Sequence, residues 1–178
     1  MMKEEPCEFE LGDIRNIKKT QQLFDKEFLP AIVLFNPKYP HNVGGTIRAA
    51  SNFGAKLIIF TGDRVSLEPP QDKTKYRLPR EERMKGYKDV VIIHDEYPFN
   101  RFSCAITPVA VELRLNSEIL GHFIHPDNGV YVFGPEDGSI PQIYLTHCHR
   151  FVRIPSKHCL NLAAAVNVIL YDRLIKME

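Results

Sequence analysis

Short runs of apolar residues, bounded by polar or turn-forming residues, recur along this chain at lengths typical of buried strands. The runs are Ala31–Phe35, Lys56–Phe60, Val90–Ile93, Ser103–Thr107, Gly129–Phe133 and Phe151–Ile154. Continuous apolar runs of this length are buried on both faces, as in parallel sheets covered by helices. The pattern therefore predicts an α/β fold with a parallel sheet, in which Thr107-Pro108 ends the fourth strand.

Helical patterns alternate with these strands. Asn42 is predicted to cap a helix that Gly54 closes, so residues 31–60 form one strand–helix–strand unit. The last helix is predicted to begin near Asn161, where apolar residues follow helical spacing (Leu162, Ala165, Val166, Ile169 and Leu170). A looser helical stripe lies between Asp13 and Phe28. Ser117 to His125 is expected to be a short helix or an irregular segment.

The chain of 178 residues is long enough for one domain with a real core. We expect a polar N-terminal extension over residues 1–30 and a single folded domain over residues 31–178. The net charge is only +1, so a nucleic acid would have to meet a local basic patch. Residues 71–88 hold seven basic and three acidic residues and are the candidate patch for RNA, with a solvated loop as the alternative.

The sequence favours a cytoplasmic protein without membrane contact. It contains no apolar run of about 18 residues, and its acidic beginning lacks the pattern of a secretory signal. The four cysteines show no close pairing, which favours reduced thiols. His147 and His149 lie near each other, but the chain has no usual four-ligand spacing, so we expect no metal site.

Three polar segments follow predicted strands and are the candidate functional site. They are Asn42 to Arg48, Gly134-Pro135-Glu136, and Ile154-Pro155 followed by Leu160-Asn161. Ligands of open α/β sheets bind at the carboxyl ends of the strands, so the three junctions predict one composite site for a small polar ligand. Two adjacent glycines within the first segment weaken a helix, which predicts that a backbone or a ligand approaches closely there.

Each residue of this site also has an ordinary structural role. Asn42 and Asn161 could serve only as helix caps, and Glu136 only as a first-turn helix residue. Arg48 could be a solvated surface residue or a phosphate-binding one. Cys159 next to His158 could suggest a nucleophile and its base, although adjacent residues rarely reach that geometry.

Together the three segments resemble the motifs of the SPOUT superfamily, in its SpoU/TrmH branch of RNA ribose 2′-O-methyltransferases. Asn42 and Arg48 match the first motif, Gly134-Pro135-Glu136 the second, and Ile154-Pro155 with Leu160-Asn161 the third. The resemblance covers about residues 31–175. It implies a parallel sheet flanked by helices with a C-terminal deep trefoil knot, and a homodimer with each site at the subunit interface.

The resemblance also implies the chemistry. S-adenosylmethionine would be held by the knot loops, at positions that correspond to Thr107, Gly134, Ile154, Cys159 and Leu160. Arg48 would act on the ribose hydroxyl, Asn42 and Asn161 would orient the site, and Glu136 would support the first motif. The implied activity is 2′-O-methylation of RNA, with tRNA favoured over rRNA because the chain is short.

Two features differ from the family pattern. Cys159 stands where the third motif has serine, and the stretch from Pro155 to Leu160 is about three residues shorter than the family pattern. These differences support an alternative hypothesis, a catalytically weak or inactive SPOUT-fold protein that binds RNA. A nucleotide-binding enzyme unrelated to methylation is a weaker alternative, because the chain contains no phosphate-binding loop pattern.

Overall fold

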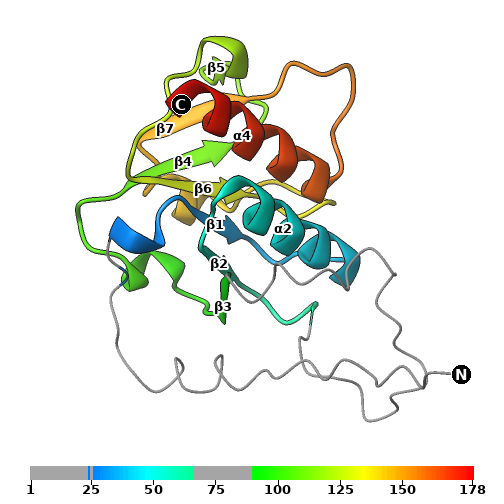
Figure 1. Cartoon of the computed structure of the whole chain (residues 1–178). Helices are drawn as coiled ribbons and strands as arrows, with labels where there is room; N and C mark the ends of the chain where they lie inside the picture. The colour runs from blue at the N-terminus through cyan, green and yellow to red at the C-terminus, as the bar shows by residue number, and fades with distance from the viewer. Residues whose placement is uncertain (1–23, 25, 66–89) are drawn as a thin grey trace, which may run out of the picture.

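A seven-stranded sheet organises the computed structural model, which describes residues 24, 26–65 and 90–178 (Figure 1). The strands are β1 (Ala31–Leu34), β2 (Leu57–Phe60), β3 (Val91–His94), β4 (Thr107–Val111), β5 (Glu118–Ile119), β6 (Gly129–Phe133) and β7 (Arg150–Arg153). Their order is β3-β2-β1-β6-β4-β7-β5, and every neighbouring pair is parallel. The predicted parallel α/β fold is confirmed.

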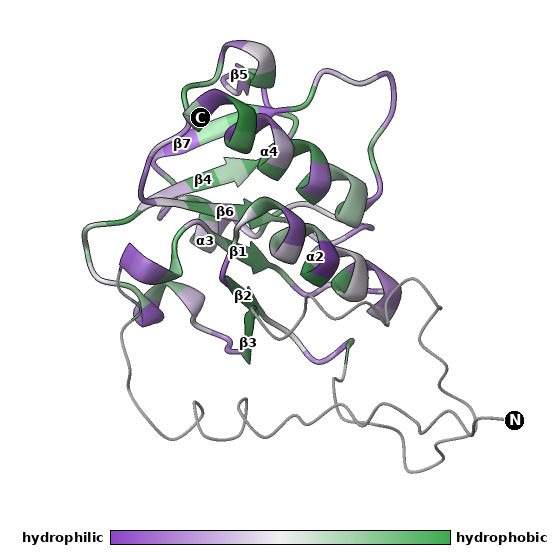
Figure 2. Cartoon of the chain, in the orientation of Figure 1, coloured by the Kyte–Doolittle hydropathy of each residue, from purple (hydrophilic) through white to green (hydrophobic). Residues whose placement is uncertain are grey.

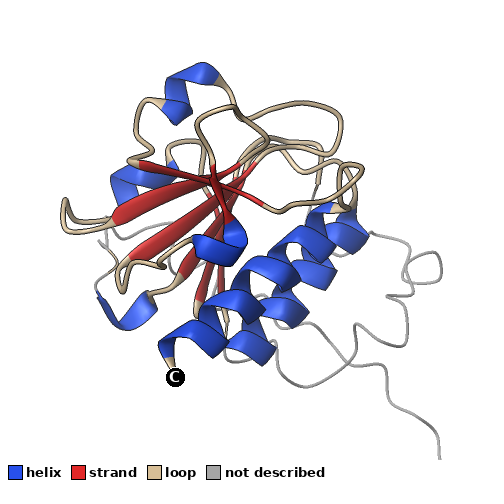
Figure 3. Ribbon diagram, turned by 90° about the horizontal axis from the view of Figure 1, so that it is seen from above, coloured by secondary structure: helices blue, strands red, loops and turns tan. Residues whose placement is uncertain are grey.

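Two long helices lie side by side on one face of this sheet (Figure 3). They are α2 (Pro40–Phe53) and α4 (Leu162–Met177). The shorter helical segments are α3 (Gln142–Leu145), η1 (Lys26–Phe28), η4 (Pro98–Arg101) and η5 (Leu120–His122). Phe24, Phe102 and Leu145 pack against the sheet on the face opposite to the two long helices. Both faces are therefore covered, which is why the strands read as continuous apolar runs.

The alternation of side chains along β1 shows how the two faces are filled. Ile32 and Leu34 pack in the cluster beneath α2 and α4, while Ala31 and Val33 pack in the cluster on the other face, and all four are fully buried. Figure 2 shows β1, β2 and β3 as largely hydrophobic, whereas β5, β7 and the two long helices carry hydrophilic residues as well. The sheet is thus the centre of the core, and its strand ends are left for polar residues.

Gly45 explains how closely α2 and α4 approach each other. A Cβ atom built on Gly45 would lie 2.8 Å from the Cβ of Ala163 on α4, closer than carbon atoms pack. The close approach expected from the paired glycines is therefore a contact between two helices. It brings the first turns of α2 and α4 together, and these turns carry the first and third polar segments.

We expect Gly45→Val to destabilise the protein by about 1–3 kcal/mol, because the added atoms overpack the helix contact. Thermal unfolding followed by circular dichroism measures the change. Gly121→Val is the matched control, since a Cβ at Gly121 meets nothing within 4 Å. Equal melting temperatures for the two variants would contradict the packing role of Gly45.

The fourth strand differs from the prediction. It spans Thr107–Val111, so the Thr107-Pro108 pair begins the strand that it was expected to end. A proline is tolerated at the start of a strand, where its missing N–H costs no ladder hydrogen bond. β4 pairs with β6 along its whole length but with β7 only from Val109 onward. Pro108 therefore precedes the part of β4 that pairs on both sides.

The start of α2 also differs from the prediction. The helix begins at Pro40, with Tyr39 as the N-cap residue and no side-chain cap, so Asn42 is not the cap. Pro40 fits the first helical position because its N–H would have no partner there. Gly54 closes the helix in a left-handed conformation, as expected, with φ of 79°.

The other predicted elements agree within about one residue. β7 begins one residue earlier than expected, and residues 117–125 form β5 and η5. The helical stripe from Asp13 lies largely outside the described residues, as does the basic segment at residues 71–88. At the described end of the N-terminal extension, Phe24 packs against Phe102 with its backbone N–H bonded to Arg101 O at 2.7 Å.

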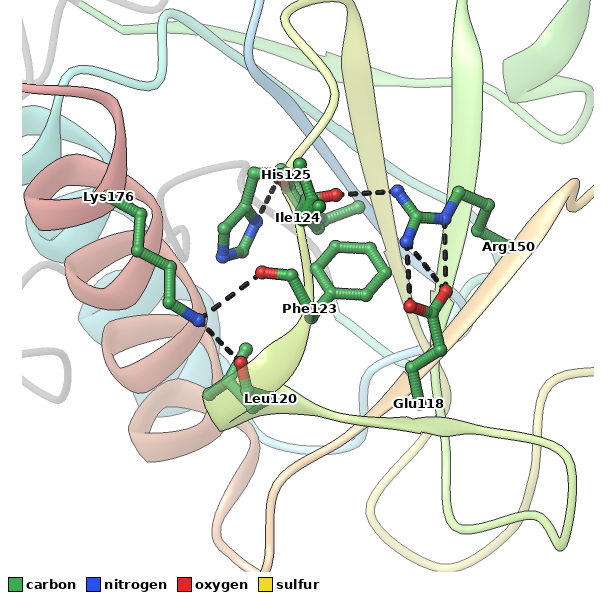
Figure 4. A network of polar contacts seen from close by, with 8 residues as sticks. Glu118, Leu120, Phe123, Ile124, His125, Arg150 and Lys176 are labelled. Atoms are coloured by element: carbon green, nitrogen blue, oxygen red, sulfur yellow. Dashed lines mark hydrogen bonds and ion pairs between the residues drawn. The ribbon is translucent and has the colours of Figure 1, made fainter.

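Polar contacts from α4 and from β7 hold the segment between β5 and β6 on two sides (Figure 4). On one side, Lys176 of α4 donates to the carbonyl oxygens of Leu120 and Phe123, at 2.6 and 3.3 Å. On the other side, Arg150 of β7 binds the Glu118 carboxylate through two nitrogens and lies over the Phe123 ring. The Lys176 contacts join the last turn of α4 to this segment, and the Arg150 contacts join the same segment to β7.

Candidate active site

A chain of three polar side chains joins the three sequence segments. Asn161 Nδ2 donates a hydrogen bond to Asn42 Oδ1 at 2.8 Å, and Asn42 Nδ2 donates to Glu136 Oε1. The residues stand 119 and 94 positions apart in the sequence. Side-chain hydrogen bonds therefore connect the three segments that the sequence predicted to lie together.

The second carboxylate oxygen of Glu136 is also bound. It accepts a hydrogen bond from the backbone N–H of Lys38 at 2.8 Å, in the loop between β1 and α2. Partial burial alone would raise the pKa of Glu136, but the hydrogen bonds from Asn42, Lys38 and the Tyr39 backbone outweigh it and hold the pKa below 4.5. Glu136 is therefore a carboxylate at neutral pH, suited to hold partners and poorly suited to accept a proton.

Local sequence explains where each member of this chain stands. Asn42 lies in the first turn of α2 and is 2% exposed, so its amide has no access to water and must find partners within the protein. Glu136 lies in the loop after β6, six residues before α3, and not in the first turn of a helix. Asn161 is the N-cap of α4, where its Oδ1 accepts from the N–H of Ala164 at 3.2 Å, as the sequence predicted.

A cleft of about 240 Å³ lies beside this chain of side chains. Its apolar wall is made by Val111, Phe133, Ile140, Leu162 and Ala165, and its rim by the loops that follow β4, β6 and β7. These three strands are neighbours, so their carboxyl ends open into the same space. The cleft therefore combines an apolar pocket with exposed backbone groups.

Four of the five predicted cofactor positions line the cleft: Gly134, Ile154, Cys159 and Leu160. Glu136 lines it as well. Thr107 does not, because it lies at the opposite end of β4, where its hydroxyl donates to Asn128 Oδ1 at 2.9 Å. The misplaced strand boundary caused this difference: the carboxyl end of β4 is Val111, and the residues after it line the cleft.

Arg48 lies on α2 with its side chain exposed, and it is not among the described residues that line the cleft. Asn42 and Arg48 are six residues apart, so they point in different directions around the helix. The structure thus joins Asn42, Glu136 and Asn161, and places Arg48 on the neighbouring surface.

Sequence reasoning did not single out Glu112 and Arg153, which also line the cleft. Glu112 follows β4 directly, and Arg153 is the last residue of β7. Glu136 was identified because it follows the carboxyl end of a buried strand. If β4 had been predicted to end at Val111, the same rule would have identified Glu112. Arg153 precedes the Ile154-Pro155 pair and carries no signal of its own beyond its charge.

The other candidate chemistry has weaker support. Cys159 and His158 are both exposed, and no hydrogen bond joins their side chains among the residues described. In the same part of the chain, no group of three or more histidine, cysteine or acidic side chains is arranged to hold a metal ion. The helices that the structure describes are also too short or too polar to cross a membrane.

The fold and the cleft define an α/β protein with a candidate ligand site at the carboxyl ends of parallel strands. Residues 30–171 match the SpoU rRNA Methylase family, so the chain belongs to that family of RNA methylases. The tRNA (cytidine-2′-O-)-methyltransferase TrmJ of Methanocaldococcus jannaschii is 28% identical over 156 residues, which cover 80% of this chain and 66% of that protein. The chain thus spans just under two thirds of the length of this relative.

Solved structures share the fold. One, from work on the 2-OH methylation of C/U34 on tRNA, is 23% identical, with a TM-score of 0.67 over 83% of this chain and 89% of the other. An AdoMet-bound rRNA methyltransferase from Sinorhizobium meliloti is 23% identical, with a TM-score of 0.64 over 80% of this chain and 54% of the other. At these identities the likeness concerns the fold.

Proposed function

We propose that this protein is an S-adenosylmethionine-dependent RNA methyltransferase that methylates a ribose 2′-hydroxyl in tRNA. The observation that carries the proposal is the Asn161–Asn42–Glu136 chain beside a cleft, in a member of an RNA methylase family. The relative from Methanocaldococcus jannaschii, a tRNA 2′-O-methyltransferase, supports both the reaction and the class of RNA.

The cleft has the features that S-adenosylmethionine requires. Its apolar wall suits a purine ring, and the loops at Gly134, Ile154 and Leu160 offer backbone groups at its rim. Gly134 makes a tight turn, since a Cβ there would lie 3.0 Å from the backbone nitrogen of Ile140. These residues would hold the cofactor, which supplies an activated methyl group when bound.

The residues of the chain would position the acceptor and stabilise charge. Glu136 fixes the amide of Asn42, and Asn161 holds the same amide from the other side, so the site is rigid before RNA binds. Arg48 would bind the ribose oxygen or the adjacent phosphate and stabilise negative charge as the hydroxyl loses its proton. A guanidinium keeps its proton at neutral pH, which favours this electrostatic role over that of a base.

A homodimer is part of the proposal. Val168, Tyr171 and Ile175 are 37%, 54% and 51% exposed and lie along one side of α4. Phe53 of α2 contacts the Tyr171 ring, so the exposed apolar side continues onto α2, which carries Arg48. A second copy that packed here would cover this surface and bring Arg48 near a cleft. Sedimentation equilibrium should give twice the monomer mass; a monomer would contradict this part.

We also infer a knotted C-terminal region. β7 lies beyond β4 in the sheet, yet α4 packs on α2, which follows β1. The connection over residues 154–161 must therefore cross the ends of β4 and β6, where the loops after these strands line the same cleft. A crystal structure in which this connection passes outside both loops would contradict the knot.

The domain division and the location complete the proposal. Residues 31–178 would form the catalytic domain, supported by the family match over residues 30–171. Residues 1–30 would be an accessory extension, whose described end packs on the core through Phe24. A tRNA substrate favours the cytoplasm as the place of action.

The test is a binding titration with S-adenosylmethionine followed by transfer of tritiated methyl groups to tRNA and to rRNA. Binding with transfer to the 2′-hydroxyl of tRNA is the expected result. The second candidate, an inactive RNA-binding protein, is favoured by Cys159 and the short loop that carries it into the cleft. RNA binding without cofactor binding would establish that second candidate.

A further inference from the structure

Glu112 is one of the residues that line the cleft, and one of its two carboxylate oxygens, Oε2, is buried without a hydrogen-bond partner among the described residues. Its backbone N–H donates a hydrogen bond to Val152 O at 3.0 Å. A buried, unpaired carboxylate oxygen is costly, so the site is built for a donor that comes with a ligand.

The position of Glu112 indicates which part of the cofactor carries that donor. Glu112 follows β4, which β6 separates from β1, whereas Asn42 belongs to the helix that follows β1. In the proposed function, the methyl group that is transferred would face the Asn42 side of the cleft. The nucleoside end would therefore lie toward Glu112, where Val111 and Ile140 contribute to the apolar wall for the base.

We propose that the Glu112 carboxylate accepts hydrogen bonds from the ribose hydroxyls of S-adenosylmethionine and thereby sets specificity for a ribonucleoside cofactor. The inference rests on the proposed function. Adjacent hydroxyls on a ribose offer two O–H donors to one carboxylate, and charge-assisted hydrogen bonds of this kind are strong. Acidic side chains at the ends of parallel strands bind ribose hydroxyls in the same way in dinucleotide-binding folds.

Arg153 is the alternative partner for Glu112 within the chain. It lines the same cleft from the adjacent strand, yet no ion pair joins the two side chains in the described part of the structure. A structural ion pair between them would make both residues matter for folding. If Glu112 contacts the cofactor, its replacement should weaken cofactor binding. The stability of the protein without ligand should not fall.

The test measures binding by calorimetry with S-adenosylhomocysteine and its 2′,3′-dideoxy analogue, which lacks both hydroxyls. For Glu112→Gln we expect the dissociation constant of S-adenosylhomocysteine to rise about tenfold or more, since a charge-assisted contact is lost. The unmodified protein should bind the dideoxy analogue about tenfold more weakly than S-adenosylhomocysteine. The variant should discriminate little between the two ligands, because hydroxyls and carboxylate act as a pair.

Thermal unfolding without ligand gives an independent result. Glu112→Gln should melt at or above the temperature of the unmodified protein, because the buried Oε2 atom that it replaces has no hydrogen-bond partner among the described residues. Glu178→Gln, at the exposed end of the chain, is the matched control and should change neither binding nor melting. Glu112→Ala removes the acceptor altogether and should weaken binding further.

Three outcomes would overturn the inference. If Glu112→Gln binds S-adenosylhomocysteine as tightly as the unmodified protein does, Glu112 does not contact the ribose. The proposed function would then stand without this inference. An equal loss for both ligands would show that Glu112 contacts another part of the cofactor. Absence of binding by the unmodified protein would overturn the proposed function together with the inference.

Discussion

Replacing Arg48 with alanine is expected to reduce methyl transfer to tRNA by about 10²–10⁴-fold, the range for removal of one catalytic group. Binding of S-adenosylmethionine should be unchanged, because Arg48 lies outside the residues that line the described cleft. The loss arises from charge that is no longer stabilised as the ribose hydroxyl is deprotonated. Single-turnover transfer of tritiated methyl groups with saturating tRNA measures the rate apart from RNA affinity.

Arg48→Lys separates charge from geometry. Lysine keeps the positive charge and loses the planar set of donors, so partial activity is expected. Arg64→Ala is the matched control, because Arg64 is a part-exposed arginine whose nitrogens bind Asp137 at 3.0 Å, outside the polar chain. Full activity of Arg48→Ala would contradict a catalytic role for Arg48. It would not contradict the proposed cofactor site.

Glu136→Gln is expected to cost about 1–3 kcal/mol of stability and to lower methyl transfer roughly tenfold to a hundredfold. The glutamine amide can accept from only one of the two donors, so either the Asn42 amide or the Lys38 N–H loses its partner. Asn42 and Asn161 would then turn away from their present orientation. Chemical denaturation and single-turnover transfer measure the two effects.

The loss of stability caused by Glu136→Gln should depend on pH in a defined direction. The pKa of Glu136 lies below 4.5 in the folded protein, so its contribution is complete above pH 4.5 and is lost as the pH falls through the lowered pKa. The difference between the unmodified protein and Glu136→Gln should shrink over that acidic range. A difference that stays constant into the acidic range would contradict the role of the carboxylate.

Asp137→Asn is the matched control for Glu136. Asp137 is the next residue, is exposed, and pairs with Lys38 and Arg64 on the surface. Hydrogen bonds from Arg64 and Lys38 also lower the pKa of Asp137, but exposed pairs contribute little to stability. Its replacement should leave both stability and transfer close to those of the unmodified protein.

The sequence predicted the parallel sheet and the meeting of three segments, because both follow from local patterns. Apolar runs such as that at Ala31 identify buried strands, and the carboxyl ends of parallel strands share one edge. Asn161 was read correctly as a cap because capping depends on neighbouring residues. The same local reasoning assigned Asn42 to a cap, whereas its partners are Glu136 and Asn161, which only the tertiary fold brings near.

The wrong boundary of the fourth strand at Thr107 and the omission of Glu112 have one physical origin. Pro108 was taken to end a strand, but it stands where β7 does not yet pair with β4. Local sequence carries no information on how far a neighbouring strand extends. The predicted carboxyl end of β4 was therefore four residues too early, at Thr107 in place of Val111, and Glu112, which follows the true end of the strand, was not singled out.

The link between Asn42 and Asn161 also couples ligand binding to folding. All seven strands precede Asn161 in the chain, yet the cleft lacks the part of its apolar wall that Leu162 and Ala165 supply until α4 has docked on α2. During synthesis, the cofactor would gain a binding site only after nearly the whole domain has left the ribosome. Cofactor bound from then on would stabilise the state in which α4 is docked on α2 by mass action, so its concentration would set the fraction of molecules in that state.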